Sequence, residues 1–226
     1  ARGGKRQAER SAQQERGKGA LFAAIGARAQ ERAARGGDAE RLGGLAETEY
    51  LYVDAMGKSA KESMIATRYQ KSELFAGGVF AAANHVASLC AEVETITTLG
   101  NLDSHEEFIR HQLKPNVKLN PIHRDGIPTT KKSRIVERGY NRKLFEIYYF
   151  DDTPAELKTQ QAIDDLIAER APEFDLVIVT DFGHGLITPS TINVLQDKAQ
   201  FLAVNTQTNS ANIGYNLITR YSKADY

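Results

Sequence analysis

The residues best suited to chemistry lie where an apolar run of the sequence stops. The run DLVIVTD ends at Asp181 and leads directly into Gly183, His184 and Gly185. An acid that leaves the carboxyl end of a buried strand can bind a hydroxyl group or help to orient a metal or phosphate, and glycines let a ligand approach the backbone closely. Alternatively, Asp181 could only cap the helix that follows. His184 could contact a phosphate, but it has no neighbouring His, Cys or carboxylate cluster, which excludes a zinc-type centre.

A glycine pair is the second candidate. Gly77 and Gly78 precede the segment VFAAANHVASL, whose apolar spacing predicts a helix. Backbone N–H groups at the start of such a helix can bind an anion or a cluster of hydroxyl groups. A tight strand-to-helix turn with no ligand explains the pair equally well.

Basic residues alternate with apolar ones over residues 129–152, a pattern that predicts a β-hairpin turning at GYNR. They are Lys131, Lys132, Arg134, Arg138, Arg142 and Lys143. The simplest interpretation is a solvated basic face of a half-exposed sheet. The alternative is a flap that donates one or two of these cations to a phosphorylated substrate. The sequence has no nucleophile elbow, Walker A sequence or metalloprotease helix, which excludes those classes of enzyme.

Alternating helices and strands are predicted to position these residues. Strands are expected at 49–55, 63–78, 92–100, 117–125, 129–139, 143–152, 175–181 and 201–207, and helices at 79–90, 104–115, 153–174 and 188–200. Ser104 is the predicted N-cap of its helix, and Thr153, Pro154 and Glu156 form a predicted capping box. The runs 175–181 and 201–207 are expected to be buried strands.

This order predicts an α/β fold with a mostly parallel sheet, helices on both of its faces and a small β-rich flap. Ligands of such sheets bind beyond the carboxyl ends of the strands. The TDFGHG and VNTQTNS turns both lie at that edge.

Composition narrows the function further. The 226 residues contain 29 basic and 29 acidic side chains, so no global field favours nucleic acid or a membrane surface. The single cysteine, Cys90, excludes an internal disulfide framework. No apolar run approaches the roughly 20 residues of a membrane span, and no signal peptide is recognised at the start, so we expect a cytoplasmic protein with no membrane partner.

Residues 1–44 differ in composition from the rest and are rich in Ala, Arg and Gly. We interpret them as a solvated or disordered basic extension, with helix around residues 21–34, and place the folded domain at 45–226. An RNA-binding arm is the alternative. Five acids among ten bases, without interleaved aromatics, argue against it.

Five segments taken together resemble the ribokinase-like (PfkB) carbohydrate kinases, and among them most closely the heptose-7-phosphate kinase module of ADP-heptose synthesis. The segments are EYLYVDAMGKSAKE, FAGGVFAAANHVASLCAEVETITTLG, GIPTTKKSRIVERGYNRKLFEIYYFDD, DLVIVTDFGHGLIT and FLAVNTQTNS. The resemblance implies a three-layer sandwich with a small β lid, C-terminally truncated in this chain. It also implies ATP-dependent phosphorylation of a sugar or sugar phosphate, with Mg²⁺.

The resemblance also implies roles for single residues. Gly77 and Gly78 match the glycine pair that lines the sugar pocket. Lys132 and Arg134 match basic positions on the lid, and Asp181 matches the acid of the turn after a sheet strand. His184 stands where a lysine is frequent, and Asn205 stands where an acid follows the next strand.

Several family residues are missing. The first strand of the family ends in G-D, and a sugar-binding acid follows; the matching positions hold Gly43, Gly44 and Thr48. The asparagine of the glycine-pair helix falls at Ala81, with Asn84 as a substitute. The family's N-x-x-E and G-A-G-D motifs are absent, and the aspartate of the latter is its general base.

Because phosphoryl transfer depends on positioning and on electrostatic stabilisation, we expect an incomplete kinase domain that is inactive by itself. A non-catalytic module that binds sugar phosphates is the alternative function. The aromatic residues of FEIYYFDD further predict a homodimer formed through the lid hairpin.

Overall fold

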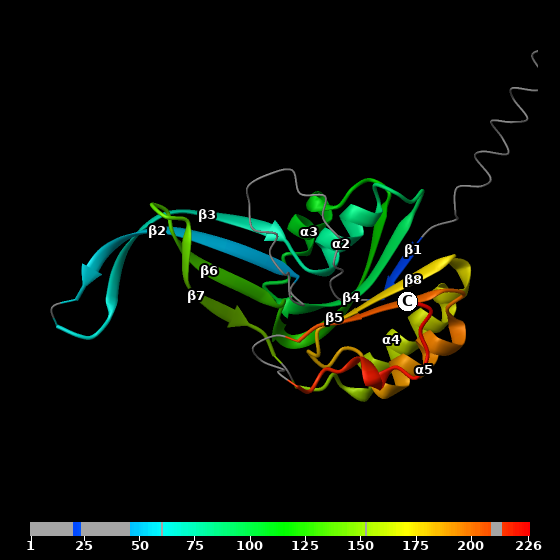
Figure 1. The fold of residues 1–226 in the computed structure, drawn as a ribbon. Helices are drawn as coiled ribbons and strands as arrows, with labels where there is room; N and C mark the ends of the chain where they lie inside the picture. The colour runs from blue at the N-terminus through cyan, green and yellow to red at the C-terminus, as the bar shows by residue number, and fades with distance from the viewer. Residues whose placement is uncertain (1–19, 24–45, 60, 152, 209–213) are drawn as a thin grey trace, which may run out of the picture.

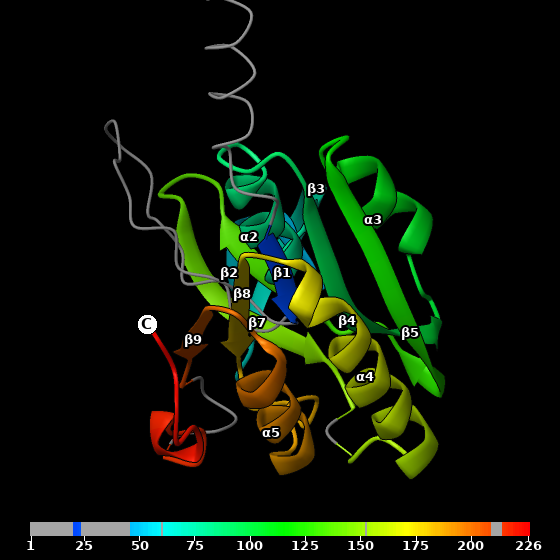
Figure 2. The same cartoon turned by 90° about the vertical axis from the view of Figure 1, so that its right-hand side faces the viewer.

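A computed structural model describes the backbone of residues 20–23 and the whole of residues 46–59, 61–151, 153–208 and 214–226. The elements are β1 (Ala20–Ala23), β2 (Glu47–Lys58), β3 (Ile65–Ala76), α2 (Val79–Val86), β4 (Val93–Leu102), α3 (Glu106–Gln112), β5 (Val117–Pro128), β6 (Lys131–Glu137), β7 (Arg142–Tyr149), α4 (Leu157–Arg170), η1 (Ala171–Glu173), β8 (Leu176–Asp181), α5 (Pro189–Lys198), β9 (Leu202–Thr206) and η2 (Ile218–Arg220). They form two sheets with helices on both faces of the larger one (Figures 1 and 2).

The larger sheet has the order β5-β4-β1-β8-β9, and every neighbouring pair in it is parallel. Successive side chains of a strand alternate between its faces, so each buried strand contributes to two cores. Phe80 of α2 and Ile109 of α3 pack in one core, and Ile163 of α4 and Leu195 of α5 pack in the other. The predicted three-layer sandwich with a mostly parallel sheet is confirmed.

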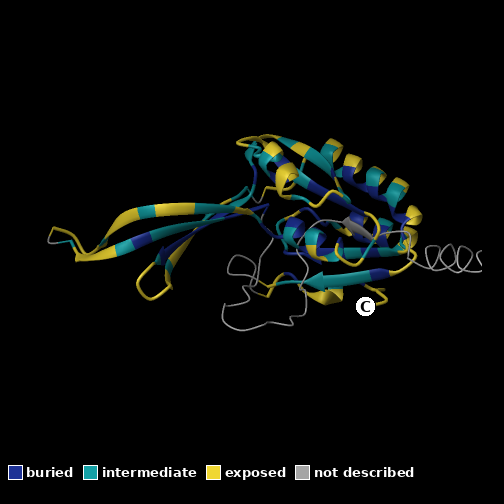
Figure 3. Ribbon diagram, turned by 90° about the horizontal axis from the view of Figure 1, so that it is seen from above, coloured by how far each residue is buried: buried dark blue, intermediate teal, exposed yellow. Residues whose placement is uncertain are grey.

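The smaller sheet, which we call the lid, has the order β3-β2-β6-β7. Its β2/β3 and β6/β7 pairs are antiparallel hairpins, whereas β2 and β6 pair in parallel. The long β2/β3 hairpin projects well beyond the larger sheet, and its outer part is mostly exposed (Figure 3). The predicted β flap is therefore present, and it is built from four strands.

The N-terminal segment differs from its expected conformation. Residues 21–23 are extended and belong to β1, which lies in the middle of the larger sheet. A helix around 21–34 is therefore wrong for its first three residues, since their hydrogen bonds go to β4 and β8. The other residues of the predicted extension, 1–19 and 24–44, lie outside the described part of the chain.

Two of the four predicted helix starts are also wrong. In α3 the N-cap is His105, in the left-handed conformation, rather than Ser104. In α4 the helix begins only at Leu157, with Glu156 as N-cap. The N–H of Thr153 donates to Asp151 Oδ1 at 2.9 Å and its hydroxyl donates to the same oxygen, so the side chain of Thr153 is directed to Asp151 and not to the helix. The start of α5 is as expected, since Thr188 accepts from the N–H of Thr191 in a capping box.

The strand predicted at 201–207 is present as β9, but it is an edge strand and only its first residue is buried. The backbone near the last residue lies beside it. The N–H of Val204 donates to the carbonyl of Tyr226 (2.8 Å), and the N–H of Asp225 donates to the carbonyl of Leu202 (2.8 Å). Residues 225–226 thus form backbone hydrogen bonds along the outer edge of β9.

Candidate functional site

The glycine pair forms the turn between β3 and α2, and each glycine is needed for a different reason. Gly78 has φ 54° and ψ −122°, a backbone conformation that residues other than glycine rarely adopt. Gly77 lies against β2, where an added Cβ would be only 2.7 Å from Oγ1 of Thr48. The pair therefore brings the start of α2 into close contact with the base of the lid.

Thr48 is the polar residue at this junction. It is buried, and its Oγ1 has no hydrogen-bond partner among the described residues. Buried hydroxyl groups in native proteins are nearly always hydrogen-bonded. The hydroxyl of Thr48 is therefore a candidate contact for a ligand at the position where the resembling kinases have an acid.

One face of the lid connects this junction to the TDFGHG turn. Thr48 is paired with Lys132, and Lys132 with Tyr148, so the three side chains share a face. The ammonium of Lys132 lies 4.7 Å from the centroid of the Tyr148 ring. The ring centroids of Tyr148 and Phe150 are 6.2 Å apart. Phe150 in turn packs on His184 at 5.4 Å. We call this side of the lid its inner face; it comprises Thr48, Tyr50, Lys132, Arg134, Glu146 and Tyr148.

The inner face holds two buried cations. The side chains of Lys132 and Arg134 are only 8% and 3% exposed. Lys132 Nζ lies 2.6 Å from Oε2 of Glu146, and Arg134 Nε donates to Oε1 of the same carboxylate at 2.9 Å. Arg134 also donates to the hydroxyl of Tyr50 at 2.8 Å. Of the predicted hairpin bases, these two are therefore not part of a solvated face.

Glu146 is held as a carboxylate by its donors. Partial burial raises its pKa, but hydrogen bonds from Lys132, Arg134 and Tyr148 outweigh burial and lower the pKa to about 2. The Tyr148 hydroxyl donates to Oε2 at 2.8 Å. The lid cations and Glu146 thus form one ion cluster with a formal charge of +1.

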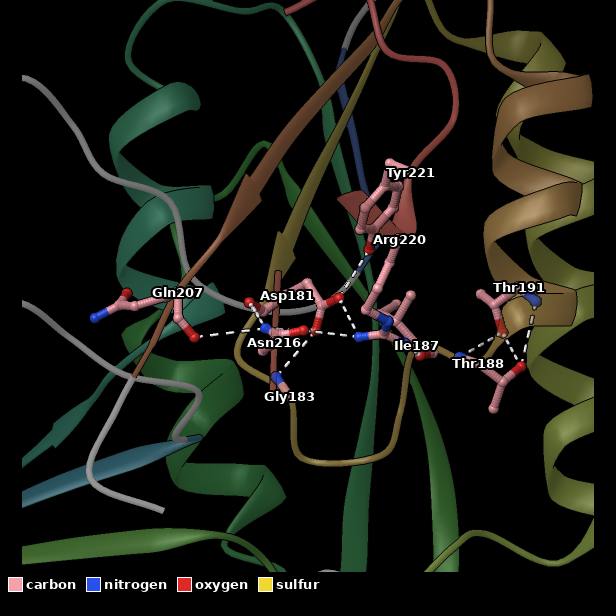
Figure 4. Close-up of polar contacts among 9 residues, drawn as sticks. All are labelled: Asp181, Gly183, Ile187, Thr188, Thr191, Gln207, Asn216, Arg220 and Tyr221. Carbon is pink, nitrogen blue, oxygen red and sulfur yellow. Dashed lines mark hydrogen bonds and ion pairs between the residues drawn. The ribbon is translucent and has the colours of Figure 1, made fainter. Parts of the chain in front are cut away.

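Asp181 is the central hydrogen-bond acceptor of the turn that follows β8 (Figure 4). Its Oδ1 accepts from the N–H of Gly183 (2.9 Å), and its Oδ2 accepts from Arg220 (2.9 Å) and from the hydroxyl of Tyr221 (3.0 Å). Burial, followed by the charge of Asp181, raises the pKa of Tyr221. Asp181 does not cap α5, because Thr188 does so; that alternative is wrong.

Backbone carbonyls of the turn also bind residues far along the sequence. Asn216 Nδ2 donates to the carbonyl of Asp181 at 2.7 Å, and Arg220 also bonds to the carbonyl of Ile187. Asp181 therefore fixes the shape of the turn, in which Gly183 and Gly185 have φ of 72° and 80°. Both of its oxygens are engaged within the protein.

The two predicted asparagines lie in different places. Asn205 of β9 pairs with Thr180, one residue before the Asp181/Thr206 pair, at the carboxyl edge of the sheet. Asn84 lies outside the site, since its amide donates to the carbonyl of Gln112 and accepts from the N–H of Lys114 at 2.8 Å each. It anchors α2 to the connection between α3 and β5 and is not placed beside the glycine pair.

Sequence reasoning missed several residues of these clusters. Glu146 and Tyr148 alternate with the same period as Lys132 and Arg134, so the hairpin register would have revealed a common face. Asn216, Arg220 and Tyr221 had no such signal. They lie in or beside the short 3₁₀ helix η2, and only the fold brings them to Asp181.

Several solved structures share this fold. The chain superposes on a possible 1-phosphofructokinase from Thermotoga maritima with a TM-score of 0.54 and 9% identity, covering 84% of this chain and 54% of that one. A phosphofructokinase-2 variant from Escherichia coli gives a TM-score of 0.51 and 12% identity over 72% of this chain and 52% of that one. The fold is that of the ribokinase-like carbohydrate kinases, as the sequence resemblance implied.

Sequence comparison finds relatives of one kind, the bifunctional protein HldE. The bifunctional protein HldE of Rhodopseudomonas palustris strain BisB18 is 24% identical over 163 residues, covering 71% of this chain and 33% of the relative. HldE of Nitrobacter hamburgensis is 27% identical over 177 residues, covering 76% and 36%. The chain spans about a third of the length of these relatives. No family model matches it.

The predicted resemblance to the heptose-7-phosphate kinase module of ADP-heptose synthesis agrees with these matches to HldE, and the solved structures that share the fold are sugar kinases. Among the described residues, no helix is both long and apolar enough to cross a membrane.

Proposed function

We propose that this chain binds a sugar phosphate between the inner face of the lid and the carboxyl edge of the larger sheet. One observation supports the proposal above all: close approach, strand pairing and ring contacts together link Gly77, through Thr48, Lys132 and Tyr148, to Phe150 and His184. Three motifs that are far apart in the sequence thereby border one region. Its two buried cations suit an anionic ligand.

Different parts of the ligand would meet different residues. The phosphate belongs at Lys132 and Arg134, because these cations lie on the inner face with their carboxylate partner toward solvent. The sugar hydroxyls belong at the backbone of Gly77 and Gly78 and at the orphan hydroxyl of Thr48. Asp181 contributes by holding the turn that borders the site, and Asn205 is at its far edge.

The similarity to HldE makes a heptose 7-phosphate the first substrate to test, with other sugar phosphates as alternatives. In the complete family domain, ATP with Mg²⁺ would supply the phosphoryl group. Phosphoryl transfer needs a base for the attacking hydroxyl and donors for the charge on the transferred group. These 226 residues contain no N-x-x-E and no G-A-G-D sequence. We therefore propose binding without turnover for residues 1–226.

A coupled ATP-turnover assay with a panel of sugar phosphates tests this. We expect no turnover above a blank, whereas the same preparation gives a binding isotherm with at least one member of the panel. Robust turnover would refute the inactive-domain proposal. Binding without turnover by the complete product of the source gene would favour the alternative, a non-catalytic module for sugar phosphates.

We further propose a homodimer formed through the outer face of the lid. Phe145, Ile147 and Tyr149 of β7 all point to the side opposite Lys132 and are exposed, and Tyr69 of β3 shares that side. A row of exposed large apolar side chains on an edge strand is typical of an association surface.

A further inference from the structure

The ion cluster of the lid is arranged with its anion outermost. The side chains of Lys132 and Arg134 are 8% and 3% exposed, whereas that of Glu146 is 30% exposed. Glu146 comes from β7, the edge strand of the lid, and Arg134 lies opposite it on β6. An anion from solvent that is to contact both cations therefore meets the Glu146 carboxylate first.

The carboxylate uses the donors that a phosphate would need. Lys132 Nζ and the Tyr148 hydroxyl bond to Oε2 at 2.6 and 2.8 Å, and Arg134 Nε bonds to Oε1 at 2.9 Å. Phosphate and carboxylate compete for such donors because both accept charge-assisted hydrogen bonds from the same nitrogen groups. A phosphate can form these bonds only when Glu146 gives them up.

The charges of the cluster also indicate that phosphate and the Glu146 carboxylate compete. Two cations and one carboxylate sum to +1, and a phosphate monoester carries roughly −1.5 to −2 at pH 7. Adding the ester to the intact cluster leaves net negative charge in a partly buried place, which is unfavourable. Without the carboxylate charge the cations would match the phosphate.

We propose that Glu146 is a specificity-determining residue of the lid: it occupies the anion position between Lys132 and Arg134 and lowers the affinity of the lid for the phosphate group of a substrate. This inference rests on the proposed function of the inner face. It deepens that function by assigning the lid an internal competitor for its ligand. A substrate must then gain enough binding from its sugar part to displace the carboxylate.

The test compares the wild type with Glu146→Gln and with Glu73→Gln as a matched control. Glu73 lies on the same side of the lid and loses the same charge, but its partners are Lys71 and Tyr52. Isothermal titration calorimetry with inorganic phosphate and with heptose 7-phosphate should show roughly tenfold tighter binding to Glu146→Gln, the size of one charge-assisted hydrogen bond, and no change for Glu73→Gln. Unchanged or weaker binding to Glu146→Gln, or an equal gain in the control, overturns the inference.

A second variant covers the case in which Glu146→Gln does not fold. Glu146→Asp keeps the charge but shortens the side chain, which weakens its bonds to Lys132 and Arg134 and leaves every donor in place, so phosphate should bind this variant a few-fold more tightly than the wild type. Phosphate should also raise the melting temperature of each variant more than that of the wild type, since a ligand stabilises the state that binds it better. Equal shifts contradict the inference.

Lys132→Met separates this inference from the function on which it rests. If Lys132→Met abolishes phosphate binding and Glu146→Gln has no effect, only the role of Glu146 is wrong. If Lys132→Met binds as the wild type does, or if no variant binds phosphate at all, the proposed phosphate position in the lid and the inference both fail.

Discussion

Single carboxylates organise both parts of the candidate site. Glu146 holds the two buried cations of the lid, and Asp181 holds the turn after β8 together with the last 11 residues from Asn216. Both carboxylates accept from several donors, so removing either leaves buried donors without partners. That loss costs more than the net value of the bonds themselves.

Glu146 gives stability a defined pH dependence. A carboxyl group whose pKa is about 2 in the folded protein and 4.5 in the unfolded chain stabilises fully above pH 4.5, and this contribution is lost as the pH falls through the folded value. Glu146→Gln should therefore reduce the free energy of unfolding by about 2 kcal/mol at pH 7. The difference from the wild type should shrink between pH 4.5 and pH 2.

Urea denaturation at pH 7, 5 and 3 measures this difference. Glu107→Gln, at an exposed carboxylate, serves as the control and should change stability by less than about 0.5 kcal/mol throughout. A difference between wild type and Glu146→Gln that is constant over the whole range would contradict the ion cluster.

Asp181→Asn tests the turn. The amide keeps the size of the side chain but cannot accept all of the bonds from Gly183, Arg220 and Tyr221, so we expect a loss of roughly 2–4 kcal/mol in the free energy of unfolding. Asp197→Asn removes an exposed ion pair with Lys198 and should have a much smaller effect on stability. Equal losses in chemical denaturation would mean that Asp181 is not the central acceptor of the turn.

At the scale of elements, the junction between β2 and α2 positions the lid on the sheet. Gly77 allows this contact because it has no side chain. A Cβ added to it would overlap the hydroxyl of Thr48 and no other atom, since the next nearest atoms are at 3.5 Å or more. Gly77→Ala should destabilise the protein by about 1–3 kcal/mol through this overlap.

A double-mutant cycle with Thr48→Ala isolates the cause. Removing the hydroxyl should restore most of the stability lost in Gly77→Ala, with a coupling of about 1 kcal/mol or more. Gly78→Ala should lose stability as well, yet show no coupling to Thr48→Ala, because its cost comes from the backbone conformation. Equal coupling at both glycines would contradict this account of the pair.

Elements with strong periodicity were predicted from the sequence. The capped start of α5, the buried strand β8 and the β6/β7 hairpin all agree with expectation, because each combines an apolar pattern with local turn or cap residues. The start of α4 differs from the prediction, because the hydroxyl of Thr153 binds the Asp151 carboxylate and does not cap the helix. The edge position of β9 depends on strand order, which apolar patterns do not encode.

The candidate site was only partly predictable, for the same reason. Gly77, Gly78, Lys132 and Arg134 were identified from local patterns, and the lid register brings the two cations together. Asn84 had the right residue type near the right helix, but its amide is used to anchor the α3–β5 connection. That Glu146 belongs to the site follows only from the register of β7 with β6, which places it opposite Arg134.

At the scale of the whole molecule, the lid has two different sides. Its inner face holds the ion cluster, and the other side exposes Phe145, Ile147, Tyr149 and Tyr69. If that side forms the homodimer, Phe145→Lys should shift the molecular mass in light scattering from dimer toward monomer, because a charge would be buried without a partner.

Leu157→Lys is the matched control for the dimer, since Leu157 is also exposed but lies at the start of α4, away from the lid. Its mass should equal that of the wild type. A monomeric wild type at micromolar concentration would refute the dimer proposal without affecting the proposed site.

The central claim is that the inner face of the lid binds the phosphate of a sugar phosphate. Calorimetric titration of heptose 7-phosphate and of the unphosphorylated heptose into the wild type and Lys132→Met tests it most directly. We predict that the wild type binds the phosphorylated sugar at least about tenfold more tightly than the free sugar, and that Lys132→Met loses this preference. Equal affinity of the wild type for both sugars, or an unchanged preference in Lys132→Met, would contradict the account.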